Sequence, residues 1–152
     1  MLYILFISSH AMANLKEIFF PMLAFCFLYP LGFTVSEDRL FMNYHIHIIN
    51  DLPPNVPSVV FLHCKSKNRD IGQKSILLHQ DYTWDSTINL TRTTLFFCQV
   101  WWDVKKRYFV AFKANRDEVR CRKYHNSCMW SVRGDGIYFS NNNSTWTNEY
   151  PW

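Results

Sequence analysis

The sequence predicts an all-β fold, a small antiparallel β-sandwich of seven to eight short strands with two disulfides. Short segments alternate apolar and polar residues, and turn-forming residues recur between these segments at regular spacing. No long segment carries the apolar stripe that a surface helix needs. Phe, Tyr and Trp make up 18% of the 152 residues, which provides many large apolar side chains for the core of one domain.

The stretch from Thr94 to Trp102 predicts the strand on which the others pack. With a period of two, Phe96, Cys98 and Val100 fall on the same wholly apolar face as Trp102. The positions between them are mixed, which suits a central strand whose outer side is partly covered. Most of the stretch consists of β-branched and aromatic residues, which fit a pleated surface.

Similar alternation predicts further strands on both sides of this one. In chain order they cover residues 44–50, 58–65, 74–79, 81–84, 107–113, 128–132 and 137–140. Prolines break the pattern at 51–57, a charged loop occupies 65–72, and Gly134-Asp-Gly136 predicts a tight hairpin turn. The charged segment 114–126 is expected to hold at most one short helical turn. The polar tail from about residue 141 is expected to be loose, with the folding back of Trp146, Tyr150 and Trp152 as the alternative.

Residues 1–36 have the pattern of a secretory signal peptide. Lys16 precedes the uncharged apolar run 18–35, and cleavage is expected after Ser36. A transmembrane anchor is the alternative, because the run is almost long enough to span a bilayer. Two prolines interrupt it, and a soluble pattern follows at once. We therefore expect a secreted chain with no stable membrane insertion after signal cleavage.

Met12 is the more natural start of that signal, which suggests that residues 1–11 come from an extended gene model. The expected mature segment, 37–152, reads as a single domain. It keeps 15 of the 16 Lys and Arg residues and 11 of the 12 Asp and Glu residues, so its formal net charge stays at +4. This is well short of the excess typical of nucleic-acid-binding proteins, and we expect no nucleic-acid partner.

Four cysteines remain in the mature segment, namely Cys64, Cys98, Cys121 and Cys128. An even number in a small secreted domain is typical of a disulfide framework, and four cysteines allow three connectivities. Zinc is disfavoured because no pair has the usual ligand spacing. Among the three connectivities our working prediction is the nested one, with Cys64 paired to Cys128 and Cys98 paired to Cys121.

Three sequons are candidate glycosylation sites: Asn89-Leu-Thr91, Asn142-Asn-Ser144 and Asn143-Ser-Thr145. The last two overlap, so at most one of them is expected to carry a glycan. Asn89 lies between two predicted strands, where an exposed loop would tolerate the modification.

A series of short motifs follows a fixed order through residues 44–139. They are His47-Ile-Ile-Asn-Asp-Leu52, His63-Cys-Lys-Ser-Lys67, Asp70-Ile-Gly72, Tyr82 with Trp84, Thr94-Leu-Phe-Phe-Cys98 and Cys128-Met-Trp-Ser-Val-Arg-Gly-Asp-Gly-Ile-Tyr-Phe139. In this order, with four cysteines and a signal peptide, the chain resembles the plant self-incompatibility S1 family, the S-protein homologues. It departs from that pattern at Trp84-Asp-Ser-Thr87, which lacks an aromatic residue two positions after the tryptophan, and in its asparagine-rich tail.

The resemblance implies a small secreted plant protein of β-sandwich type. The founding members of the family are stigma proteins that act as ligands for a pollen-surface receptor in self-pollen rejection. We therefore expect an extracellular signalling ligand for a cell-surface receptor, acting in self-incompatibility or related communication between cells. We expect no catalytic residues, cofactor or metal, and the oligomeric state stays open.

Two charged loops are the predicted receptor contacts, because a rigid sandwich displays its loops. The first comprises Lys65, Lys67, Arg69 and Asp70, and the second comprises Lys105, Lys106 and Arg107. Their cations could meet an acidic patch on a receptor, which would mainly speed the encounter.

Two other functions are alternatives to the signalling ligand. A secreted glycan-binding module could stack sugar rings on exposed aromatic residues, for which Trp101, Tyr108 and Trp146 are candidates. A small secreted hydrolase would have to use histidines, namely His45, His47, His63, His79 and His125. The pair at 45 and 47 faces one way on a strand and could bind a metal, but no carboxylate lies nearby in sequence to complete the site. Nucleophile-elbow and phosphate-loop motifs are missing.

Overall fold

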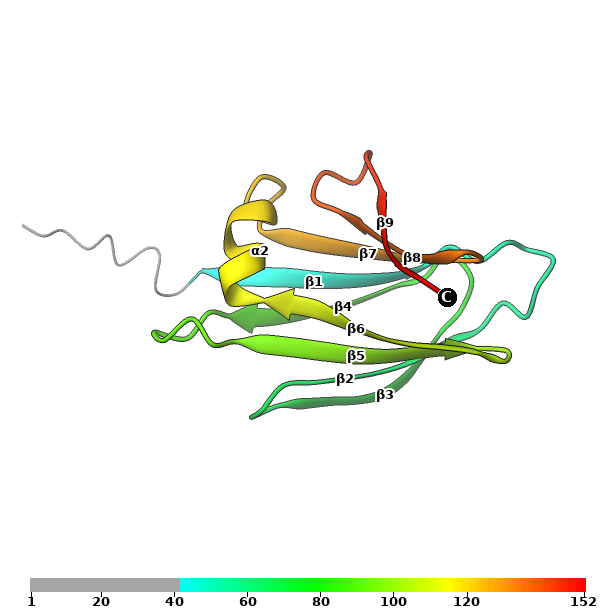
Figure 1. Cartoon of the computed structure of the whole chain (residues 1–152), viewed down its shortest axis with the longest axis horizontal. Coiled ribbons are helices and arrows are strands. Elements are labelled where there is room, and N and C mark those ends of the chain that lie inside the picture. The colour runs from blue at the N-terminus through cyan, green and yellow to red at the C-terminus, as the bar shows by residue number, and fades with distance from the viewer. Residues whose placement is uncertain (1–41) are drawn as a thin grey trace, which may run out of the picture. The chain divides into compact units, whose positions relative to one another are not determined.

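The computed structural model describes residues 42–152 and folds them into two facing β-sheets and one short helix (Figure 1). The elements are β1 (Asn43–Asn50), β2 (Val60–Lys65), β3 (Asp70–Ile76), β4 (Asp81–Thr87), β5 (Leu95–Trp102), β6 (Lys105–Lys113), α2 (Ala114–Arg120), β7 (Ser127–Arg133), β8 (Gly136–Ser140) and β9 (Thr147–Pro151). One sheet has the strand order β4-β1-β7-β8-β9 and the other has the order β3-β2-β5-β6. The predicted all-β sandwich is confirmed. The predicted signal peptide, 1–36, lies outside the described residues.

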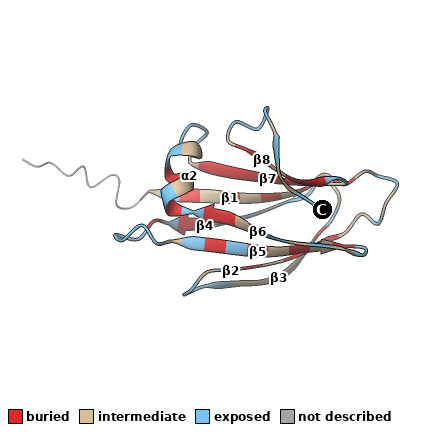
Figure 2. Ribbon diagram, viewed as in Figure 1, coloured by how far each residue is buried: buried red, intermediate tan, exposed pale blue. Residues whose placement is uncertain are grey.

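The core lies between the two sheets and follows the predicted alternation. On β5 the four residues of the apolar face are each at most 5% exposed, and on β1 Ile46 and Ile48 are fully buried. Trp130 of β7 spans the gap between the layers, because its indole Nε1 donates to the carbonyl of Ala111 on β6 at 2.8 Å. β7 lies in the middle of its sheet and is buried along almost its whole length (Figure 2).

One strand pair departs from the antiparallel prediction. β1 and β7 run parallel, with His45 opposite Ser127 and Asn50 opposite Val132. The chain returns through α2 to the end of the sandwich where β1 begins, and the backbone N–H of His45 donates to the carbonyl of Asn126 at 2.9 Å. β7 therefore starts beside the start of β1 and can only run in the same direction.

The predicted disulfide pairing is wrong, although all four cysteines are paired. Cys64 bonds to Cys98, and Cys121 bonds to Cys128. Cys64 and Cys98 lie directly opposite each other on β2 and β5, with their Cα atoms 4.1 Å apart. The proposed partner Cys128 lies in the other sheet, where it bonds to Cys121 with their Cα atoms 5.0 Å apart.

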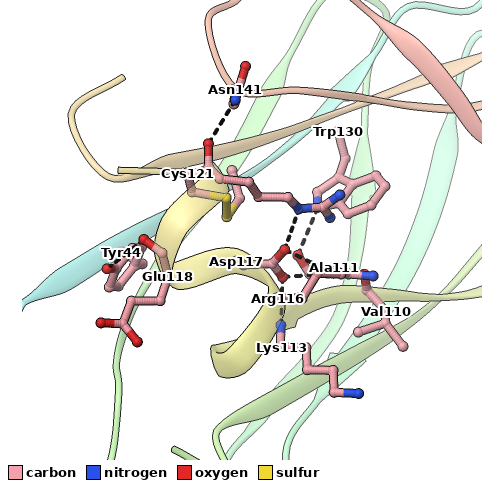
Figure 3. Close-up of a disulfide and its surroundings, with 12 residues drawn as sticks. Tyr44, Val110, Ala111, Lys113, Arg116, Asp117, Glu118, Cys121, Trp130 and Asn141 are labelled. Carbon is pink, nitrogen blue, oxygen red and sulfur yellow. Dashed lines mark hydrogen bonds and ion pairs between the residues drawn. A yellow bond between two sulfur atoms is a disulfide. The ribbon is translucent and has the colours of Figure 1, made fainter. Parts of the chain in front are cut away.

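α2 is longer than the single turn that the sequence predicted, because a buried carboxylate holds it in place of an apolar stripe. Asp117 is fully buried and accepts hydrogen bonds from the backbone N–H of Lys113 at 2.6 Å and from Nε of Arg116 at 2.9 Å (Figure 3). It also accepts from the guanidinium of Arg120. Burial alone would lower the pKa of Arg116, but the hydrogen bonds and charge of Asp117 outweigh it and raise that pKa.

The C-terminal tail is ordered, and the prediction of a loose tail from about residue 141 is therefore wrong. β9 pairs with β8, and Tyr150 packs against Phe109 and Trp130 with ring centroids 5.6 and 5.8 Å apart. Trp152 donates from Nε1 to the carbonyl of Arg133 at 2.7 Å. Glu149 pairs with Arg120 of α2 at 2.7 Å, which joins the last strand to the helix. Across residues 42–152 no helix has the length and apolar character needed to cross a bilayer.

A basic cleft as the candidate functional site

A cleft of about 1170 Å³ opens at the end of the sandwich where the β2–β3 loop faces the end of β4 and the β4–β5 loop. This end lies at the left of Figure 1. The first wall carries the cations Lys65, Lys67 and Arg69. The opposite wall consists of residues 85–87 and of residues from the following loop, including Asn89. The predicted first receptor-contact loop therefore forms one side of a concave surface.

The β2–β3 loop is held by its own short hydrogen bonds. The backbone N–H of Ser66 donates to the carbonyl of Arg69 at 2.7 Å, and the N–H of Arg69 donates back to the Ser66 hydroxyl at 3.0 Å. A serine that bonds its own backbone in this way stabilises a tight turn. The turn projects Lys67 and Asn68 into solvent at its tip. The turn therefore holds Lys67 in a defined position at the tip of the loop.

The three cations of this loop have different surroundings. Arg69 donates from Nη1 to the carbonyl of Asp85 at 2.8 Å, so it bridges the cleft to β4 of the other sheet. The ammonium of Lys65 lies 5.4 Å from the ring centroid of Phe97. Lys67 makes no ion pair or side-chain hydrogen bond with the rest of residues 42–152. Of the three, Lys67 is therefore the cation that has no partner within residues 42–152.

Asp70, the fourth predicted contact, is engaged within the sheet. Its carboxylate bonds Nε2 of His63 at 2.7 Å and accepts from the backbone N–H of Gly72 at 2.7 Å. The Gly72 hydrogen bond, and after it the contact with His63, lower the pKa of Asp70 below its ordinary value. Gly72 has a φ of +77°, a conformation that side chains with a Cβ rarely adopt. Asp70 thus shapes the start of β3.

The second predicted contact loop lies far from the first, because β5 runs antiparallel to β2 and the β5–β6 turn falls at the opposite end of the sheet. Lys105 donates to the carbonyl of Gly134 at 2.7 Å and stacks against Trp102 and Trp152. Lys106 is exposed beside Tyr108. Arg107 lies opposite Val100 and is half-buried. The structure therefore divides the predicted contacts between two separate places.

The five candidate histidines are spread over the molecule, and three of them form hydrogen bonds with carboxylates. His45 lies 2.6 Å from Asp85, and His47 lies 2.7 Å from Asp81. Both carboxylates come from β4, which pairs with β1, so sequence distance hid them. His63 pairs with Asp70, as described above. His79 lies 4.0 Å from Asp51, and His125 stacks edge-on against Tyr124.

One group of potential metal ligands is close-packed in the described part of the chain. It consists of Asp117, Cys121 and Cys128. The two sulfur atoms are bonded to each other, so they are not thiolates and do not offer the ligands that zinc takes from cysteine. The carboxylate is already used by Arg116 and Arg120.

The candidate glycosylation sites lie in two exposed loops. Asn89 lines the cleft, and its side-chain Nδ2 donates to the hydroxyl of Thr93 at 2.8 Å. Asn142 and Asn143 lie between β8 and β9, where Oδ1 of Asn142 accepts from the backbone N–H of Thr145 at 2.8 Å. A glycan at Asn89 would stand at the edge of the cleft. In the sequence, the sequon at Asn89 is the feature that indicates this wall of the cleft.

The fold and the disulfides define a small cross-linked β-sandwich domain, and comparisons with known proteins give its family. Residues 45–152 match the family model of plant self-incompatibility protein S1, and the chain belongs to that family. It is 44% identical to S-protein homolog 18 of Arabidopsis thaliana over 92 residues, which cover 60% of this chain and 66% of that protein. It is 33% identical to S-protein homolog 20 of the same plant, over 81% of this chain and 87% of the relative. The match thus spans just under two thirds of homolog 18.

A solved structure shares the fold at low sequence identity. It belongs to the SPH (Self-Incompatibility Protein Homologue) proteins, described as a widespread family of small, highly stable, secreted proteins from plants. The TM-score is 0.58 with 19% identity, and the match covers 74% of this chain and 96% of the other. It supports the sandwich architecture independently of the closer sequence relatives.

Proposed function

We propose that this chain is a secreted plant protein that acts as a signalling ligand for a cell-surface receptor, and that the β2–β3 loop is its contact. Family membership and the secreted SPH proteins of the same fold support the extracellular setting. The observation that carries the contact is the position of Lys67. It is an exposed cation with no ion pair in residues 42–152, at the tip of a braced turn on the edge of a cleft.

The charge around the cleft favours an acidic partner surface. Lys65 and Lys67 face solvent, whereas the nearby carboxylates Asp70 and Asp85 are paired with His63 and His45. Because these carboxylates already have hydrogen-bond partners and Lys67 has none within residues 42–152, the exposed charge most open to a partner is positive, which would steer an acidic surface into contact. Because the turn is braced before binding, little conformational freedom would be lost on association.

Charge reversal at the loop tip tests this proposal. Lys67→Glu is expected to slow the association of labelled protein with intact plant cells at low ionic strength, with a smaller effect at high ionic strength. Lys123→Glu is the matched control, because Lys123 is also exposed but lies after α2 and does not line the cleft. Equal association of the two variants at low salt would reject the loop as the contact.

We propose that the chain has no enzymatic activity, since its relatives are S-protein homologues, a family not known as enzymes. His45 and His47 each bond a β4 carboxylate, and these bonds also have a structural role in joining the two strands. Hydrolytic activity of the purified protein that is lost in His47→Ala would overturn this part of the proposal.

A further inference from the structure

The outer side of the β3-β2-β5-β6 sheet carries large aromatic residues that face solvent. Phe61 of β2 and Trp101 of β5 lie opposite each other and stack, with ring centroids 5.8 Å apart and planes 16° apart. Phe97 lies further along β5, and Tyr108 lies on β6 opposite Gln99. Phe61, Phe97, Trp101 and Tyr108 are called the aromatic face below. Tyr108 is 62% exposed and Phe97 is 39% exposed.

No element of residues 42–152 covers this side, because the second sheet packs on the opposite side of β5 (Figure 1). Single exposed apolar residues are normal on a protein, but neighbouring ones on adjacent strands mark an interaction surface. Two members of this face, Trp101 and Tyr108, are residues that the sequence predicts as candidates for stacking on sugars. The third candidate, Trp146, packs against Arg133 and does not belong to this face.

A row of polar side chains crosses the middle of the aromatic face. In the strand register His63 lies opposite both Gln73 of β3 and Gln99 of β5, and Gln99 lies opposite Tyr108. Within residues 42–152 the side-chain amides of the two glutamines have no hydrogen-bond partner. Each amide offers donors and an acceptor toward solvent. Flat rings with free amides between them suit a ligand that alternates apolar ring faces with hydroxyl groups, as a carbohydrate does.

Two lysines add positive charge at opposite ends of the same face. Lys65 lies opposite Phe97 and 5.4 Å from the centroid of its ring, and Lys106 lies opposite Trp101 and 5.7 Å from the ring centroid of Tyr108. The carboxylate at the border, Asp70, is already bonded by His63 and Gly72. An aromatic platform flanked by lysines therefore complements a sugar that carries a carboxylate.

We propose that the aromatic face binds an acidic polysaccharide built of uronate units. The pyranose rings stack on Trp101 and Tyr108, the hydroxyl groups bond Gln73 and Gln99, and the carboxylates pair with Lys65 and Lys106. This function is additional to receptor contact through Lys67. It would let the protein bind a carbohydrate matrix while the loop tip remains free.

A second copy of this chain fits the same face less well. A two-fold symmetric dimer places the same surface on both partners, so Lys65 and Lys106 would meet other parts of an equally basic face with no free carboxylate. Polar side chains run through the centre of the aromatic face, whereas the centre of a stable protein interface is rich in aromatic residues and poor in charge. Charge and polarity together favour the anionic carbohydrate.

Titration calorimetry with oligogalacturonate, a uniform uronate polymer, tests the proposal. Wild-type protein is expected to bind, and Trp101→Ala and Tyr108→Ala are each expected to weaken binding by about tenfold through loss of a stacking ring. Tyr108→Phe keeps the ring and is expected to bind like wild type. Val119→Ala is the matched control, because Val119 is an apolar residue 71% exposed on α2. Since Tyr108 is largely exposed, its replacement is expected to leave the unfolding temperature unchanged.

Three results would overturn the proposal. They are no binding by wild-type protein, equal binding by Tyr108→Ala and wild type, or a concentration-dependent dimer in sedimentation that Tyr108→Ala abolishes. Lys67→Glu separates this proposal from receptor contact. It is expected to keep most of the oligogalacturonate affinity while association with wall-free protoplasts slows, whereas Tyr108→Ala is expected to lose oligogalacturonate affinity and to keep its association with protoplasts.

Discussion

At the scale of single residues, Asp117 shows how a buried charge can take the place of hydrophobic contacts. Its carboxylate receives the backbone N–H of Lys113 and the guanidinium groups of Arg116 and Arg120. Arg120 then stacks on Phe139, with its guanidinium carbon 3.6 Å from the ring centroid. One residue therefore caps the helix and fixes it to the sandwich.

Asp117→Asn is predicted to lower the free energy of unfolding by about 3–5 kcal/mol, because it removes the charge of a buried carboxylate, which leaves Arg116 without a counter-charge and Arg120 with Glu149 alone. Chemical denaturation at neutral pH measures this change. Val119→Ala, on the exposed side of the same helix, is expected to change it by less than about 0.5 kcal/mol. A loss no larger than that of the control would show that the network does not hold the helix.

Asp70 gives a prediction about pH. Its pKa is lowered in the folded state, so its contribution to stability is present above the ordinary value of 3.8 and is lost as the pH falls through the lowered value. Asp70→Asn keeps a hydrogen-bond acceptor for Gly72 but removes the charge. We expect the variant to be less stable than wild type at neutral pH, and the difference to shrink below pH 3.8. Thermal unfolding across this range measures it, and a constant difference would contradict the assignment.

Residue alternation was the part of the fold that the sequence predicted best. The buried positions of β1 and β5 follow directly from a period of two, since one face of each strand had to be apolar. The His–Asp pairs could not be predicted, because His45 and Asp85 are 40 residues apart and meet only through the β1–β4 register. The lack of a partner for Lys67 within residues 42–152 could not be predicted either, because it depends on which neighbouring groups bond to other residues.

At the scale of elements, the two disulfides have different roles. Cys64–Cys98 closes a sequence separation of 34 residues across the centre of one sheet, whereas Cys121–Cys128 closes only 7 and fastens the end of α2 to β7. In the loop-entropy model these separations correspond to stabilisations of about 3.8 and about 2.5 kcal/mol. The longer loop therefore restricts the unfolded chain more strongly.

The double variant Cys64→Ala/Cys98→Ala is predicted to lose more stability than Cys121→Ala/Cys128→Ala. Thermal unfolding under non-reducing conditions compares them, and a non-reducing peptide map of the wild-type protein checks the pairing itself. A peptide that joins Cys64 to Cys128 would contradict the structure. A larger loss from the short-loop pair would show that anchoring α2 outweighs the restriction of the unfolded chain.

The elements that sequence patterns missed are those with little apolar periodicity of their own. α2 has a buried carboxylate in place of an apolar stripe. β9 is an edge strand of five residues, and its attachment depends on Tyr150 and on the Glu149–Arg120 pair. The wrong disulfide pairing had a related cause, because Cys64, Cys98 and Cys128 all lie on apolar strand faces and the pattern does not say which sheet each strand joins.

At the scale of the whole molecule, the sandwich separates its proposed functions in space. The free cation Lys67 lies at the tip of one end loop, and Trp101 and Tyr108 lie on the outer side of one sheet. The core and the two disulfides fix these surfaces relative to each other within residues 42–152. Such a scaffold tolerates change in its loops without loss of the fold.

The most direct test of the receptor proposal is photo-crosslinking from the loop tip on living plant cells. A photoreactive residue at position 67 is expected to capture a membrane protein of the cell surface, and the same residue at position 123 is expected not to. Excess unlabelled wild-type protein should abolish the crosslink, and excess Lys67→Glu should compete less well. Equal capture from both positions, or no competition by wild-type protein, would contradict the account of this chain as a ligand that binds through its β2–β3 loop.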